Sequence, residues 1–122
     1  MRWIPVRGDS MWPSLRSGDL AGVAPLTREP RPGEVVLARF DDALVLHRVQ
    51  ALRQGHWSLR GDNAPGEDPP IAPSRILGTV LRVRRGGVEL GEEWDQGPSR
   101  LGRVRAVVRG WVARWLGRGG RS

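Results

Sequence analysis

The chain has 122 residues, no cysteine and a net charge of +7. This length suits a single domain with one core, and the lack of cysteine excludes disulfides, zinc–thiolate sites and a thiol nucleophile. No apolar run approaches the roughly 18 to 20 residues that a spanning helix needs, so we expect a cytoplasmic protein without a transmembrane segment.

The positive charge is confined to the C-terminal part of the chain. All 20 basic residues are arginines. Residues 1–96 hold 13 arginines and 13 acidic residues, whereas residues 97–122 hold seven arginines and no acid. We therefore expect a neutral core over 1–96 and a basic tail over 97–122.

Short apolar segments separated by Gly and Pro dominate the first 96 residues. Strands are expected over residues 2–6, 19–25, 34–40, 44–50, 56–60 and 76–83, with a stub at 88–90. The pair 34–40 and 44–50, joined by a turn at Asp41–Asp42–Ala43, is the clearest hairpin. Residues 64–73 contain four prolines and are expected to form an irregular loop. This pattern is typical of a mainly β fold, a small coiled antiparallel β-sheet or open barrel.

The tail has a different pattern. Over residues 99–116, apolar side chains recur at steps of three and four, which predicts a basic amphipathic α-helix: Leu101, Val104, Val108, Trp111 and Trp115. Three roles are open for it. The helix could pack on the β core, lie on an anionic membrane as a peripheral contact, or bind nucleic acid through arginine and tryptophan; nucleic acid is the least favoured partner.

A serine is presented on a turn near the N-terminus. Ser10 follows Gly8, and Pro13 prevents a helix from running through the segment. A serine hydroxyl is a poor nucleophile until a base takes its proton. The chain contains no lysine, so the candidate bases are His47, within an apolar strand, and the less favoured His56 at a turn.

A histidine base needs an acceptor that fixes its tautomer and stabilises the imidazolium. Two aspartates that follow the strand predicted over residues 56–60 could supply this acceptor. Asp62 lies in the turn Gly61–Asp62–Asn63, and Asp68 lies in the loop beyond it. The residues alone leave both alternatives open.

Four motifs in this order resemble the boxes of type I signal peptidases and of the wider signal peptidase/LexA-like serine peptidase superfamily. They are Ser10-Met11-Trp12-Pro13-Ser14-Leu15 with Gly18-Asp19, Pro32-Gly33-Glu34-Val35-Val36, His47-Arg48-Val49, and Gly61-Asp62-Asn63 with Asp68. Histidine stands where bacterial leader peptidases carry lysine, which makes the chain similar to the endoplasmic-reticulum and archaeal type.

The resemblance implies roles for particular residues. Ser10 would be the nucleophile and His47 the general base, with Asp62 as the orienting carboxylate and Asp68 as the alternative or accessory acid. The Ser10 backbone N–H would supply most of the oxyanion hole, in a region that also includes Gly8 and Met11. The family's coiled β-sheet is implied, as is a substrate lying extended along sheet edges. No metal and no cofactor is expected.

The function implied is that of a serine endopeptidase. It would act as a maturation protease that cleaves a leader- or signal-peptide-bearing protein through an acyl-enzyme. Nine residues precede Ser10, so we expect a minimal core without an N-terminal membrane anchor. The alternatives are a catalytically inactive peptidase fold that binds peptides, and a membrane-surface or nucleic-acid-binding module that acts through the basic tail.

Overall fold

The computed structural model describes residues 1–97, and the tail and the helix expected over 99–116 lie outside the described residues. Residues 1–97 form a seven-stranded sheet in which all pairs are antiparallel. The sheet is open, and the prediction of a mainly β fold is confirmed. Within these residues no helix has the length and apolar character needed to cross a membrane.

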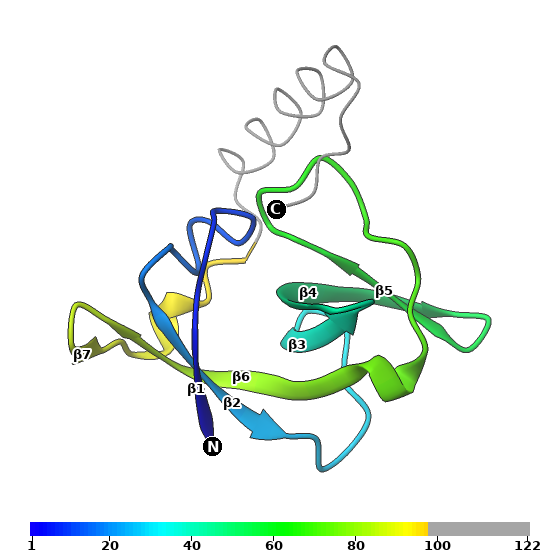
Figure 1. Cartoon of the computed structure of the whole chain (residues 1–122), viewed down its shortest axis with the longest axis horizontal. Coiled ribbons are helices and arrows are strands. Elements are labelled where there is room, and N and C mark those ends of the chain that lie inside the picture. The colour runs from blue at the N-terminus through cyan, green and yellow to red at the C-terminus, as the bar shows by residue number, and fades with distance from the viewer. Residues whose placement is uncertain (98–122) are drawn as a thin grey trace.

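The order of the strands across the sheet differs from their order along the chain. The strands are β1 (Arg2–Pro5), β2 (Leu20–Pro25), β3 (Val35–Phe40), β4 (Ala43–Arg53), β5 (His56–Arg60), β6 (Ile76–Arg85) and β7 (Val88–Glu89), with short 3₁₀ turns η1 (Pro73–Arg75) and η2 (Glu92–Trp94). The order across the sheet is β1-β2-β6-β3-β4-β5, and β7 pairs with β6 (Figure 1). Strand β6 thus separates the N-terminal pair from the β3–β5 meander.

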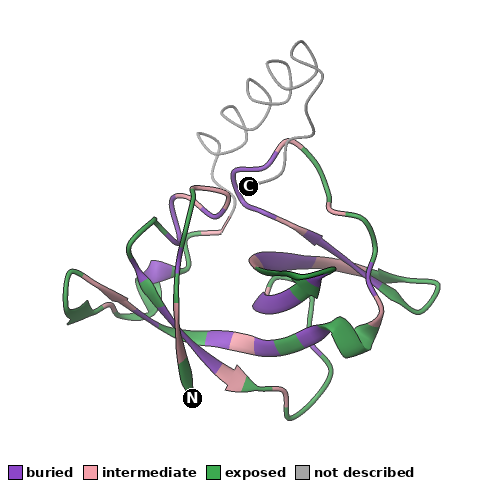
Figure 2. Cartoon of the chain, in the orientation of Figure 1, coloured by how far each residue is buried: buried purple, intermediate pink, exposed green. Residues whose placement is uncertain are grey.

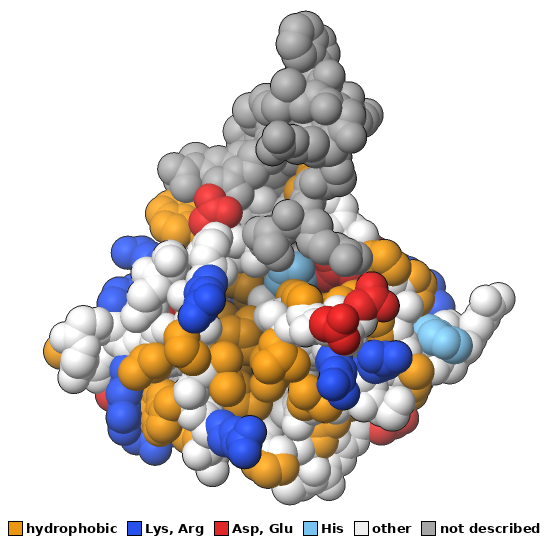
Figure 3. Space-filling model, viewed as in Figure 1, with side chains coloured by type: hydrophobic (Ala, Val, Ile, Leu, Met, Phe, Trp, Pro, Cys, Tyr) orange, Lys and Arg blue, Asp and Glu red, His pale blue; other side chains and the backbone are white. Residues whose placement is uncertain are grey.

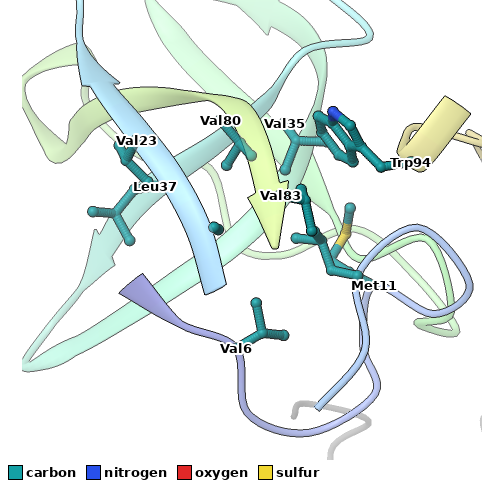
Figure 4. Packing of buried hydrophobic residues seen from close by; sticks show 10 residues of the cluster. Val6, Met11, Val23, Val35, Leu37, Val80, Val83 and Trp94 are labelled. Atoms are coloured by element: carbon teal, nitrogen blue, oxygen red, sulfur yellow. The ribbon is translucent and has the colours of Figure 1, made fainter. Parts of the chain in front are cut away.

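Strand β3 is apolar at every position except the exposed Arg39, because both of its faces are otherwise buried. Val35 and Leu37 face one hydrophobic cluster, which also contains Met11, Val83 and Trp94 (Figure 4). Its alternate residues face a second cluster with Val49, Trp57 and Leu59: Val36, Ala38 and Phe40. Buried segments accordingly run along the inner strands in Figure 2.

The predicted β3–β4 hairpin is confirmed, with Val36 opposite His47 and Phe40 opposite Ala43. Two strands run two or more residues past their predicted C-terminal ends. Strand β4 continues to Arg53 because its last residues pair with β5, and β6 continues past the expected end at residue 83 to Arg85 because it pairs with β7. The turns come later, at residue pairs with positive φ: Gln54–Gly55 and Gly86–Gly87.

The sheet curls, and its curvature brings distant segments together. The register shifts within β2, β3 and β4, and such irregularities bend strands and increase their twist. As a result the turn after β1 and the loop after β5 lie side by side (Figure 1). The Asn63 N–H donates to the Ser10 carbonyl at 2.8 Å.

Candidate active site

The turn after β1, residues 8–15, presents Ser10. Gly8 has a φ of 74°, a conformation that residues with a Cβ rarely adopt. The Trp12 N–H donates to the Asp9 carbonyl at 3.1 Å and the Leu15 N–H to the Met11 carbonyl at 3.0 Å. Met11 and Leu15 are buried in the core. The core therefore holds the turn in place through Met11 and Leu15. Neither of the two backbone hydrogen bonds just given uses the N–H of Ser10.

His47 lies on β4 beside this turn and is 2% exposed. Its Nε2 atom is 3.1 Å from the Ser10 hydroxyl oxygen. Ser10 and His47 are separated by 37 positions in the chain, and the curl of the sheet brings them into contact. The base candidate and the nucleophile candidate are thus within hydrogen-bond distance.

Asp68 lies behind the imidazole, with its Oδ2 atom 2.5 Å from His47 Nδ1. A carboxylate can only accept a hydrogen bond, so Nδ1 carries the proton and Nε2 is left as the acceptor for the Ser10 hydroxyl. The loop that holds Asp68 is fixed to β5. The Asp68 N–H donates to the Leu59 carbonyl at 2.8 Å, and the Ser58 hydroxyl donates to the neighbouring Glu67 at 2.7 Å.

Asp62, the residue that the resemblance placed behind His47, lies elsewhere. Its two carboxylate oxygens accept from Arg48 Nε and Nη2, each at 2.8 Å, and its side chain is 1% exposed. Arg48 follows His47 on a strand, so the two side chains point to opposite faces of the sheet. Asp62 therefore binds the Arg48 guanidinium on one face of the sheet. Asp68, in the loop after β5, contacts the His47 imidazole on the other face.

Arg48 is a buried cation held by several acceptors. Besides Asp62 it donates to the Asp95 carboxylate at 2.7 Å and to the Gly33 carbonyl at 2.7 Å. Burial lowers the pKa of Arg48, but the hydrogen bonds that it donates to Asp62 and Asp95 outweigh burial and raise the pKa above its ordinary value. The side chain thus remains charged and links strand β4 to the 61–63 turn.

The 61–63 turn packs directly on the Ser10 turn. Asn63 donates from its side chain to the Asp9 carbonyl at 3.1 Å. At Gly61 a Cβ atom would lie 2.6 Å from the Ser10 carbonyl oxygen and 3.1 Å from His47 Nε2. Only glycine allows the backbone to approach the Ser10–His47 pair this closely.

Replacing Gly61 by alanine should disturb this contact. The added methyl group would displace the Ser10 turn, and displacement of a reacting group by about 1 Å lowers a rate by about 100-fold. If the pair is catalytic, we expect a loss of that order in kcat, measured by steady-state cleavage of a peptide substrate. Gly66→Ala is the matched control, because a Cβ there has nothing within 4 Å. Equal kcat values for the two variants would contradict this role for Gly61.

A groove of about 440 Å³ leads to Ser10. Its walls come from β1 with the residues that follow it and from the β3–β4 hairpin. Aliphatic side chains line it at Ile4, Val6, Leu37, Leu44 and Leu46, and Arg7 and Asp42 add charge. Figure 3 shows hydrophobic side chains gathered over the middle of this face. A groove of this kind offers an apolar surface next to the serine.

The remaining candidates lie apart from this group. His56 is exposed at the start of β5, and its ring contacts the Gln54 carbonyl at 3.3 Å. Among residues 1–97, no three His, Asp or Glu side chains are grouped as metal ligands. Sequence reasoning missed the parts played by Arg48, Gly61 and Asp95. For Arg48 a signal existed, since a charged residue within an apolar strand requires a buried partner.

A comparison with models of protein families gives a match. The family model described as Peptidase S24-like matches residues 1–81, a range that includes Ser10, His47, Asp62 and Asp68. No curated protein matches the chain.

Proposed function

The chain belongs to the Peptidase S24-like family, and from this premise we propose that it is a serine endopeptidase with a histidine base. Ser10 is the nucleophile, His47 the general base and Asp68 the orienting carboxylate. One observation carries the proposal. The Ser10 hydroxyl, the His47 imidazole and the Asp68 carboxylate lie in series, joined by contacts of 3.1 and 2.5 Å.

The reaction follows from this geometry. The Ser10 oxygen attacks the scissile carbonyl carbon and transfers its proton to His47 Nε2, while Asp68 stabilises the resulting imidazolium. The Ser10 N–H donates to the oxyanion of the tetrahedral intermediate. His47 then protonates the leaving amine as the C–N bond breaks. Water, deprotonated by His47, hydrolyses the acyl-Ser10 ester and restores the enzyme.

The substrate proposed is an extended segment such as a leader or signal-like peptide. In the described part of the chain, β1 pairs only with β2, and β5 pairs with β4 only from Arg48 onward. Among residues 1–97, the side of β4 residues 43–47 away from β3 and the outer side of β1 therefore pair with no strand and present backbone groups along the groove. Such edges bind an extended peptide by adding it as a strand, and a folded segment could not supply the hydrogen bonds.

The test is cleavage of a mixture of unstructured peptides, analysed by mass spectrometry. Wild-type protein is expected to cut a subset of them at defined bonds, and Ser10→Ala, which keeps the groove, is expected to bind the same peptides without cutting them. Binding without cleavage by both proteins would instead support the peptide-binding alternative. Cleavage that persists in Ser10→Ala would contradict the proposed nucleophile.

A further inference from the structure

Residues 91–97, here called the C-terminal strap, contact both the turn that carries Ser10 and the strand that carries His47. The strap contains η2 and lies beyond residues 1–81, the range matched by the family model. Three of its consecutive residues each make a different kind of contact: Trp94, Asp95 and Gln96. Trp94 and Gln96 contact the turn that carries Ser10, and Asp95 contacts Arg48, the residue after His47.

The first contact is apolar. Trp94 is 8% exposed and belongs to the same hydrophobic cluster as Met11 and Leu15, which anchor the serine turn from below. Figure 4 shows its indole beside Val35 and Val83, on the side of the cluster where Met11 enters. A tryptophan buried to this extent fixes the path of its neighbours, because removing it would leave a large cavity.

The other two contacts are polar and more directional. Asp95 accepts from Arg48 Nη2 at 2.7 Å, and the Gln96 N–H donates to the Ser14 hydroxyl oxygen at 3.0 Å. Ser14 is fully buried, so its hydroxyl has few alternative partners. One short segment thus bonds to the strand that carries the base and to the turn that carries the nucleophile.

From these contacts we propose that the C-terminal strap is a positioning element that sets the distance between Ser10 and His47. Asp95 acts through Arg48, and Gln96 acts through Ser14. Neither group touches the reacting atoms, so neither is a catalytic residue. The inference rests on the proposed function, because a distance between nucleophile and base matters only where a proton passes between them.

Two variants test the strap independently. Asp95→Asn removes one of the two carboxylate charges that Arg48 faces, and Ser14→Ala removes the acceptor of the Gln96 N–H with little change in volume. Each is expected to lower kcat by about 10-fold or more with KM changed much less, because small displacements of reacting groups act on the transition state. Glu93→Gln is the matched control, since it removes a carboxylate from the strap that makes no contact with Arg48 among the bonds described.

A second measurement does not depend on activity. The ¹⁵N chemical shifts of the His47 ring report its tautomer and the hydrogen bond at Nε2. We expect these shifts to change in Asp95→Asn and Ser14→Ala and to stay at wild-type values in Glu93→Gln. This readout separates the two proposals, because it applies even if no peptide is cleaved.

Two outcomes would overturn the inference. One is that folded Asp95→Asn and Ser14→Ala keep wild-type ring shifts and kcat, with only thermal stability lowered. The other is that only KM rises, which would place the strap in substrate binding. If Asp95→Asn fails to fold, Ser14→Ala decides alone, because it replaces a hydroxyl by a hydrogen atom and leaves Arg48 with its carboxylate partners Asp62 and Asp95.

Discussion

Replacement of His47 by alanine is expected to lower kcat for peptide cleavage by about 10⁴-fold or more, and Ser10→Ala by a similar factor. The His47 ring, with Nε2 3.1 Å from the Ser10 hydroxyl oxygen, is the base that this hydroxyl contacts among residues 1–97, so its removal leaves the hydroxyl proton without an acceptor base there. The chain contains no lysine that could substitute. Steady-state kinetics on a peptide identified in the cleavage screen measures both losses. The double variant should be no slower than either single variant, because the two groups act as one unit.

His56→Ala is the matched control for the loss of an imidazole. This ring is exposed, and its contact is with a carbonyl in its own turn. Its removal should leave kcat within about twofold of wild type, as for surface substitutions remote from the site. Full activity of purified His47→Ala, or a large loss in His56→Ala alone, would refute the choice of base.

The second large effect separates Asp68 from Asp62. Asp68→Asn is expected to lower kcat by about 10³- to 10⁴-fold with the fold retained, because an amide no longer fixes the His47 tautomer or stabilises the imidazolium. Asp62→Asn should act mainly on stability. It removes a carboxylate from buried Arg48, which costs about 3 kcal/mol and lowers Tm by on the order of 10 °C.

Kinetics and thermal unfolding on the same two proteins distinguish these roles. The proposal predicts a catalytic loss for Asp68→Asn and a folding loss for Asp62→Asn, so the two variants should show opposite patterns. A folded Asp68→Asn protein with wild-type kcat would contradict the role of Asp68. A stable Asp62→Asn protein with kcat reduced a thousandfold would return the orienting role to Asp62.

Much of the sheet could be predicted from local patterns. The β3–β4 hairpin follows from two apolar runs around a turn that begins with Asp41 and Asp42, and the observed register confirms the hairpin. The ends of β4 and β6 could not be placed because pairing with β5 and β7 extends them. Such pairing depends on contacts with another strand rather than on the composition of the strand itself.

The choice between Asp62 and Asp68 could not be made from the sequence. Both lie in irregular segments, where no periodicity fixes the direction of a side chain. The positions of the two aspartates depend on Arg48. Its guanidinium donates to both carboxylate oxygens of Asp62, and the His47 imidazole contacts Asp68 instead. The strap was equally hidden, because its bond to Ser14 spans 82 positions and follows no local rule.

The proposed mechanism requires a covalent bond between Ser10 and the acyl group of the substrate. Intact-mass measurement after rapid mixing with an activated ester of a cleaved peptide sequence tests for it. We expect the protein to gain the mass of the acyl group, with the modification located on Ser10 by fragmentation, and to gain none in Ser10→Ala. Turnover of the ester by wild-type protein with no adduct at Ser10, or with the adduct on another residue, would contradict the proposed mechanism.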